Sequence, residues 1–299
     1  MPDAPGKHAG SSAIALPPVP SLETRHLRHD AVQTPLGKID ALIPEADIYV
    51  CKAAERPALL LIPGLGMDGN AFIRQLPLGA LCDLYFFQTP NGRVAGEEGL
   101  GHYARFVEEY ILARGLDRRP AGLILGGASM GGAITQMVAL RGRVKLRGMI
   151  LLGTFGSSDH LKALQRFAAP LAWIVPMNLI RSIGWRFAGW TRYKHLSLEE
   201  ARWHSVPVLR RTQGYFGRAV KGLTRLQLIA GIAKLRIPTL VVHGSADTVL
   251  PLKAGRQLAE TIPGARFLVV PNAGHSVHFS RCEEVNSAIA EFISVLPPN

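Results

Sequence analysis

The chain has 299 residues, of which 47% are hydrophobic and 19% are charged, a composition typical of a soluble globular protein. It contains no run of about 18 uninterrupted apolar residues, so no transmembrane helix is expected. The formal net charge is +12, but no recognisable nucleic-acid-binding motif accompanies it, and nucleic acid is therefore not an expected partner.

The first 22 residues are rich in Pro, Ala, Gly and Ser, and they predict a flexible leader. They lack the basic start and long apolar stretch of a secretory signal. The three cysteines, Cys51, Cys82 and Cys282, are odd in number and widely spaced, which favours a reducing compartment over a disulfide framework. We therefore expect a cytoplasmic protein.

Strands and helices are predicted to alternate along most of the chain. Short strands are expected within 23–52, with a turn at 34–37. Apolar runs predict further strands at 57–62, 82–87, 122–126, 146–152, 238–243 and 266–270, and helices are expected at 97–113, 132–140 and 283–295. This alternation implies right-handed crossovers and an α/β fold with a mostly parallel sheet.

The strand pattern stops between residues 152 and 238, where the sequence is helical in character. An insertion of this kind, before the sheet resumes, predicts a cap over the carboxyl ends of the strands, where ligands bind in open α/β sheets. The expected organisation is a leader at 1–22, a core at 23–154, a helical cap at 155–235 and the rest of the core at 236–299.

A G-x-S-x-G motif, Gly127 to Gly131, lies between the predicted strand at 122–126 and the predicted helix at 132–140. In this context the motif predicts a nucleophile elbow, a sharp turn that presents Ser129 in a strained conformation. Small residues two positions on either side avoid steric collisions in such a turn.

Two further polar residues follow the last two predicted strands. Asp247 comes after the strand at 238–243, and His275 comes after the strand at 266–270. A serine hydroxyl is a poor nucleophile at neutral pH, so His275 would take its proton while Asp247 orients the imidazole and stabilises the imidazolium. Because each residue ends a different parallel strand, all three are expected at one edge of the sheet.

The order Ser129, Asp247, His275 resembles that of the α/β-hydrolase superfamily, and the resemblance runs from about residue 40 to the end of the chain. It implies an α/β-hydrolase fold, a mostly parallel sheet flanked by helices with an inserted helical cap. It also implies an oxyanion hole formed by the backbone N–H groups of Met130 and Leu65. Many relatives carry His-Gly where this chain has Pro63-Gly64.

Other residues compete for these roles. Asp159 follows the strand at 146–152, where some relatives place the acid, and it remains an alternative to Asp247. His278 lies three residues after His275 and is an alternative base. His243 closes a strand and is interpreted as structural, and Asp68 is interpreted as a turn former.

A serine nucleophile implies an acyl-enzyme intermediate, so the predicted function is hydrolysis of a small-molecule or lipid acyl ester, or of a thioester, by a lipase-like serine esterase. Acyl transfer, C–C bond hydrolysis and a non-catalytic binding protein on the same fold are the alternatives. The sequence has no P-loop, dinucleotide fingerprint or clustered metal ligands, so no cofactor and no metal site are predicted.

The predicted cap is strongly basic. Residues 155–235 contain thirteen Lys or Arg against three Asp or Glu, together with all four tryptophans. Arg181, Trp185, Arg186 and Trp190 form the closest cluster, a combination suited to an anionic membrane surface. The same surface would suit an acidic acyl-carrier protein, by analogy with ester hydrolases of the superfamily. The simpler alternative is a cap that only covers the acyl pocket.

Overall fold

A computed structural model describes residues 14–22, 26–45, 55–161 and 211–297. Eight strands form one sheet in the order β1-β2-β4-β3-β5-β6-β7-β8. The strands β1 (Leu27–Thr34) and β2 (Gly37–Pro44) form an antiparallel hairpin, and β2 is also antiparallel to β4 (Asp83–Gln88). All the remaining pairs are parallel. The predicted mostly parallel α/β sheet is therefore confirmed.

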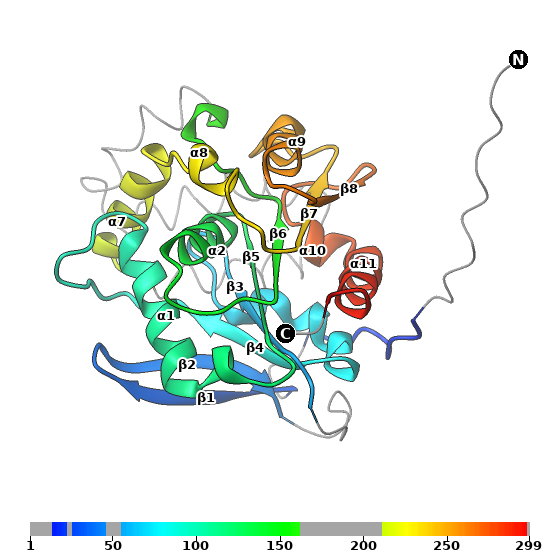
Figure 1. The fold of residues 1–299 in the computed structure, drawn as a ribbon, viewed down its shortest axis with the longest axis horizontal. Helices are drawn as coiled ribbons and strands as arrows, with labels where there is room; N and C mark the ends of the chain where they lie inside the picture. Colours follow the sequence, from blue (N-terminus) through cyan, green and yellow to red (C-terminus); the bar gives the residue numbers. More distant parts are fainter. Residues whose placement is uncertain (1–13, 23–25, 46–54, 162–210, 298–299) are drawn as a thin grey trace, which may run out of the picture.

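The central strands are β3 (Ala58–Ile62), β5 (Leu123–Ala128) and β6 (Gly148–Leu152). They are fully buried, which explains why their sequences are continuous apolar runs rather than alternating patterns. The strands β7 (Thr239–Gly244) and β8 (Arg266–Val270) complete the sheet at the edge opposite the hairpin (Figure 1).

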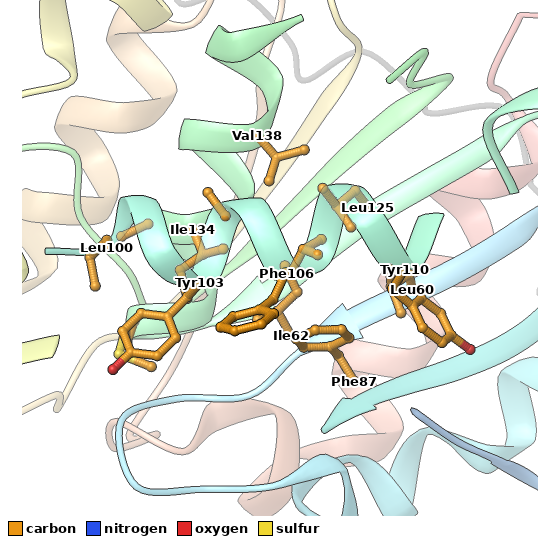
Figure 2. Close-up of a cluster of buried hydrophobic side chains, with 14 of the residues drawn as sticks. Leu60, Ile62, Phe87, Leu100, Tyr103, Phe106, Tyr110, Leu125, Ile134 and Val138 are labelled. Atoms are coloured by element: carbon orange, nitrogen blue, oxygen red, sulfur yellow. The ribbon is translucent and has the colours of Figure 1, made fainter. Parts of the chain in front are cut away.

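Helices cover both faces of the sheet. On one face, α1 (Gly101–Arg114) and α2 (Met130–Arg141) pack with strand residues such as Leu60 and Leu125 (Figure 2). The short α8 (Ile229–Ile232) and α9 (Leu252–Thr261) continue this layer over β6 and β7. On the other face, the 3-10 segment η2 (Gly69–Ala80), α10 (Val277–Ser280) and α11 (Cys282–Ser294) pack with alternate strand residues such as Leu59 and Leu61.

Most predicted elements occur within a few residues of their expected ends. The helix expected at 97–113 is α1, and Gly115 caps its end in the left-handed conformation with φ 68°. The sequence reasoning missed η2 and α9. The η2 segment contains Pro77 in its interior and two glycines, and such residues argue against a regular helix.

The leader and the cap are described only in part. From residue 14 on the leader is described, and Ile14, Leu16 and Leu22 pack against the core cluster that contains α11. Of the predicted cap, only residues 155–161 and 211–235 are described, and they include α7 (Gln213–Thr224) and α8. Cys51 and the cluster of Arg181, Trp185, Arg186 and Trp190 lie outside the described residues. Among the helices of the described ranges, none combines the length and apolar character needed to cross a bilayer.

Candidate active site

Ser129 occupies the turn between β5 and α2. Its backbone angles are φ 53° and ψ −117°, a conformation that is rare for a residue with a side chain. The two flanking glycines make this turn possible, because a Cβ atom on Gly127 would collide with the backbone of Gly131, and one on Gly131 would collide with the carbonyl of Ile62. The local geometry is therefore that of the predicted elbow.

The end of β6, the residues just after it and the start of α2 hold the backbone of Ser129. Its N–H donates to the carbonyl of Leu152 at 2.9 Å. Its carbonyl accepts a hydrogen bond from the hydroxyl of Thr154 at 2.6 Å and another from the N–H of Gly132 at 3.0 Å. The sequence did not indicate Thr154, because this residue belongs to no motif. It reaches Ser129 because β5 and β6 lie side by side in the sheet.

The structure brings Ser129, His275 and Asp247 together in one hydrogen-bonded chain. The distance from His275 Nδ1 to Asp247 Oδ2 is 2.8 Å, and the distance from His275 Nε2 to Ser129 Oγ is 2.9 Å. An ionised carboxylate only accepts, so Nδ1 carries the proton of the neutral imidazole. The Ser129 hydroxyl therefore donates to Nε2, which is the arrangement that general-base activation of a serine requires.

Four donors surround the carboxylate of Asp247. Oδ1 accepts from the N–H groups of Val249 at 2.8 Å and Leu250 at 2.9 Å, while Oδ2 lies 3.3 Å from Nε2 of His243 as well as close to His275. Burial by itself would raise the pKa of this carboxyl. The charge interaction with His275 and the hydrogen bonds from His243, His275 and Leu250 outweigh burial, and the pKa falls well below its ordinary value.

The structural interpretation of His243 omits a contact that its position in the fold provides. It is fully buried at the end of β7, and its Nε2 lies 3.2 Å from the carbonyl of Leu250. Since a carbonyl only accepts, Nε2 carries the proton and also points at Oδ2 of Asp247. No local pattern could have predicted this contact, although the four-residue spacing from His243 to Asp247 is visible in the sequence.

The two predicted oxyanion donors lie beside Ser129. Met130 is the first residue of α2, and Leu65 lies in the loop that follows β3. A Cβ atom on Gly64 would be 3.4 Å from the Cβ of Ser129, so this loop packs directly on the serine. Within the described residues, the N–H groups of Leu65 and Met130 have no hydrogen-bond acceptor. Both groups are therefore available to a ligand.

A small cavity opens beside the serine hydroxyl. Its lining includes Gly64, Leu65, Met67, Ser129, His275 and His278. Burial, with a smaller contribution from His275, lowers the pKa of His278 to about 3, so this side chain is neutral at physiological pH. The Ser129 hydroxyl donates its hydrogen bond to His275, and His278 instead packs its ring 5.2 Å from that of Phe72.

The alternative acid lies in a different environment. Asp159 Oδ2 accepts a hydrogen bond from the Ser157 hydroxyl at 2.7 Å, in the short 3-10 turn η4 (Ser158–His160). The residue beside Nδ1 of His275 is Asp247. Asp68 caps the start of η2 by accepting the N–H of Asn70 at 3.0 Å, in keeping with its interpretation as a turn former. In the described parts of the chain, no three His, Cys, Asp or Glu side chains gather as a metal-ligand set.

The sequence of this chain is similar to those of known hydrolases and of a polyketide synthase. The model of the "Alpha/beta hydrolase family" matches residues 59–288. The chain is 27% identical over 292 residues to the polyketide synthase ThaQ of Burkholderia thailandensis, a match that covers 90% of this chain but only 13% of that protein. It is 28% identical over 265 residues to a poly(3-hydroxyalkanoate) depolymerase of Ectopseudomonas oleovorans, covering 83% of this chain and 90% of the depolymerase.

The fold has counterparts among solved structures. A thermophilic esterase from Thermogutta terrifontis superimposes with a TM-score of 0.71 at 21% sequence identity, covering 89% of this chain and 98% of the esterase. At this identity the likeness concerns the fold. Together with the family match over most of the sequence, it settles the classification: this chain belongs to the alpha/beta hydrolase family.

Proposed function

We propose that the protein is a serine hydrolase that cleaves a carboxylic ester or thioester through an acyl-enzyme intermediate. The observation that carries this proposal is the hydrogen-bonded chain from Ser129 Oγ to His275 Nε2, at 2.9 Å, and from His275 Nδ1 to Asp247 Oδ2, at 2.8 Å. These distances need no rearrangement before a proton is transferred.

In the proposed acylation step, Ser129 Oγ attacks the acyl carbonyl carbon while His275 Nε2 takes the hydroxyl proton. The negative charge that develops on the carbonyl oxygen accepts hydrogen bonds from the N–H groups of Leu65 and Met130. When the tetrahedral intermediate collapses, the bond to the alcohol or thiol breaks, and His275 gives its proton to that leaving group. The acyl group is now an ester of Ser129.

Deacylation repeats the sequence with water as the nucleophile. His275 takes a proton from water, the resulting hydroxide adds to the acyl carbon, and collapse of the second intermediate returns the proton to Ser129 and releases the carboxylic acid. Asp247 stays ionised throughout, which agrees with its lowered pKa. It stabilises the imidazolium that forms in each half-reaction.

One relative supports an ester substrate, since it is named as a poly(3-hydroxyalkanoate) depolymerase. Because the match to ThaQ covers only 13% of that synthase, the activity of the whole synthase says little about this chain. Acyl transfer and C–C bond hydrolysis use the same triad chemistry and remain alternatives, and so does a non-catalytic binding role.

The test is a panel of acyl-nitrophenyl esters and thioesters graded by chain length, together with labelling by a fluorophosphonate. We expect Ser129→Ala to lose both turnover and labelling while it stays folded by circular dichroism. Ser280→Ala is the matched control, because the hydroxyl of Ser280, on α10, donates to the carbonyl of Ser276 and not to a residue of the triad. A Ser129→Ala variant that kept most of its esterase activity would refute the mechanism. Labelling without turnover of any ester would favour the other chemistries.

The cellular setting belongs to the same proposal. A cytoplasmic location fits the free, buried thiols of Cys82 and Cys282. Burial raises the pKa of the Cys82 thiol to about 12, which makes it chemically inert at neutral pH. Contact of the basic, tryptophan-rich part of the cap with an anionic membrane or an acyl-carrier protein stays a prediction, since that cluster lies outside the described residues.

A further inference from the structure

The loop that carries Leu65 is a tight turn with a defined geometry. The N–H of Met67 donates to the carbonyl of Gly64 at 3.1 Å, and Gly66 has φ 79°. This positive angle at the third residue is typical of a type II β-turn. In a trans peptide the C=O and N–H groups point in opposite directions, so the bond to the Gly64 carbonyl also fixes the direction of the Leu65 N–H.

Two buried side chains from the end of the predicted cap hold this turn. The hydroxyl of Tyr215 accepts a hydrogen bond from the N–H of Gly66 at 3.3 Å. The guanidinium of Arg211 donates to the carbonyl of Met67 and also to that of Thr89, in the loop after β4. Arg211 thereby ties together the loops that follow β3 and β4 at the edge of the sheet where Ser129 lies.

The two side chains are themselves held rigidly. Tyr215 is fully buried and Arg211 is 7% exposed. The Arg211 guanidinium carbon lies 4.9 Å from the centre of the Tyr215 ring, a stacking contact between cation and aromatic face. From α1, the hydroxyl of Tyr103 donates to the carbonyl of Tyr215 at 2.9 Å, and the two rings meet edge to face at 5.3 Å.

On this geometry we propose that Arg211 and Tyr215 are positioning residues that hold the Leu65 N–H at the place where the oxyanion forms. The inference rests on the proposed function and adds a requirement to it. Oxyanion donors contribute most when they are already oriented before the charge develops, because no free energy is then needed to turn them. A turn anchored on both its Gly66 N–H and its Met67 carbonyl meets that condition, whereas an unanchored glycine turn would sample other orientations.

The test compares two tyrosine-to-phenylalanine variants that each remove one buried hydroxyl. Tyr215→Phe removes the acceptor of the Gly66 N–H. Tyr110→Phe is the matched control, since Tyr110 is also fully buried but its hydroxyl donates to Asp30 at 2.7 Å, two helical turns along α1 from Tyr103 (Figure 2). Steady-state kinetics on a short acyl-nitrophenyl ester separates kcat from KM. A trifluoromethyl ketone inhibitor reports on the oxyanion hole directly, because the serine adds to the ketone and the oxygen of the resulting hemiketal occupies that hole.

Removing an oxyanion donor outright costs a factor of a hundred or more, so loosening one donor should lower kcat by about tenfold. We expect Tyr215→Phe to show this loss with KM unchanged within about twofold, and to weaken inhibition by the ketone by the same factor. Tyr110→Phe should lower the melting temperature without changing kcat or inhibition. If Tyr215→Phe does not fold, Arg211→Lys is measured in the same way, because a single ammonium cannot span both carbonyls that the guanidinium holds.

Equal kcat and equal inhibition in Tyr215→Phe and Tyr110→Phe would overturn the positioning role, as would a loss confined to KM. Wild-type protein that hydrolyses the ester and reacts with a fluorophosphonate establishes the proposed function independently of that comparison. Wild-type protein that does neither overturns the proposed function, and the positioning role with it.

Discussion

At the scale of single residues, the site depends on how the Asp247 carboxylate is surrounded. Its side chain is fully buried, and its oxygens face two backbone N–H groups and two imidazoles. A buried charge is tolerated only when hydrogen bonds replace its lost hydration. His275 is therefore held in one tautomer by a carboxylate that is itself fixed in place.

Replacing Asp247 by Asn tests the assignment of the acid. The amide is nearly the same size but carries no charge, so it would neither stabilise the imidazolium nor enforce the tautomer with Nδ1 protonated. We expect kcat to fall by about a thousandfold or more, with the labelling rate falling in parallel. Asp159→Asn is the control and should stay within about twofold of wild type. A larger loss in Asp159→Asn than in Asp247→Asn would move the acid role to Asp159.

At the scale of elements, the junction of β5 and α2 determines where Ser129 points. The strand is buried on both faces, and the helix starts immediately after the turn, packed against β3. This close approach leaves no room for a side chain at Gly131, where a Cβ atom would meet the Ile62 and Pro63 carbonyls. The position of the helix and the orientation of the nucleophile are therefore set by the same contact.

The substitution Gly131→Ala measures that contact. The added methyl group would force α2 away from β3, and we expect a loss of at least about 3 kcal/mol in the free energy of unfolding, measured with urea. Gly142→Ala is the matched control on the same helix. Gly142 has φ 61° but nothing within 4 Å of a built Cβ, so only the backbone strain of about 1–2 kcal/mol is expected there. Equal losses in the two variants would show that α2 does not need this close approach.

At the scale of the whole molecule, buried neutral histidines link stability to pH. Burial, with a smaller contribution from His275, lowers the pKa of His278 to about 3, and burial together with Arg218 and Arg93 lowers that of His102. An unfolded histidine has a pKa of about 6.5. Below that pH these two histidines bind protons in the unfolded chain but not in the folded protein. The free energy of unfolding therefore keeps their full contribution above about pH 6.5 and falls as the pH drops toward 3.

Replacing His278 by Phe removes one of these proton-binding groups. The free energy of unfolding of the wild type should fall more steeply between pH 6.5 and 4.5 than that of His278→Phe, by about 1.4 kcal/mol per pH unit for one proton. Urea unfolding at a series of pH values measures the slope, and a general change in stability caused by the ring exchange does not alter it. A slope equal to that of wild type would show that His278 is protonated in the folded state. The lowered pKa of Asp247 adds a further loss only below about pH 4.

The sequence by itself determined the class of fold, and it predicted Ser129, Asp247 and His275 as the site residues with Asp159 and His278 as alternatives. Each of these signals is local. An apolar run predicts a buried strand, and a pair of glycines permits a strained serine between them. A residue that follows a parallel strand is expected at the carboxyl end of that strand. Among the elements missed, η2 is interrupted by Pro77, whereas α9 is a ten-residue amphipathic helix whose Ala254 and Leu258 are buried, so a local signal was present for α9. Chain order alone placed Ser129, Asp247 and His275 at one edge of the sheet.

Only the tertiary structure decided which groups touch. It brought Asp247 rather than Asp159 to His275, and it placed His243 against the same carboxylate. It also joined Tyr215 to Gly66, a contact between residues 149 positions apart. The contact of Tyr215 follows from the packing of α7 and α1 over the strand ends, whereas those of Asp247 join β7 and the loops after β7 and β8. No local pattern encodes such contacts, because a hydrogen bond depends on positions to within a few tenths of an ångström. Sequence periodicity determines only which face of an element is buried.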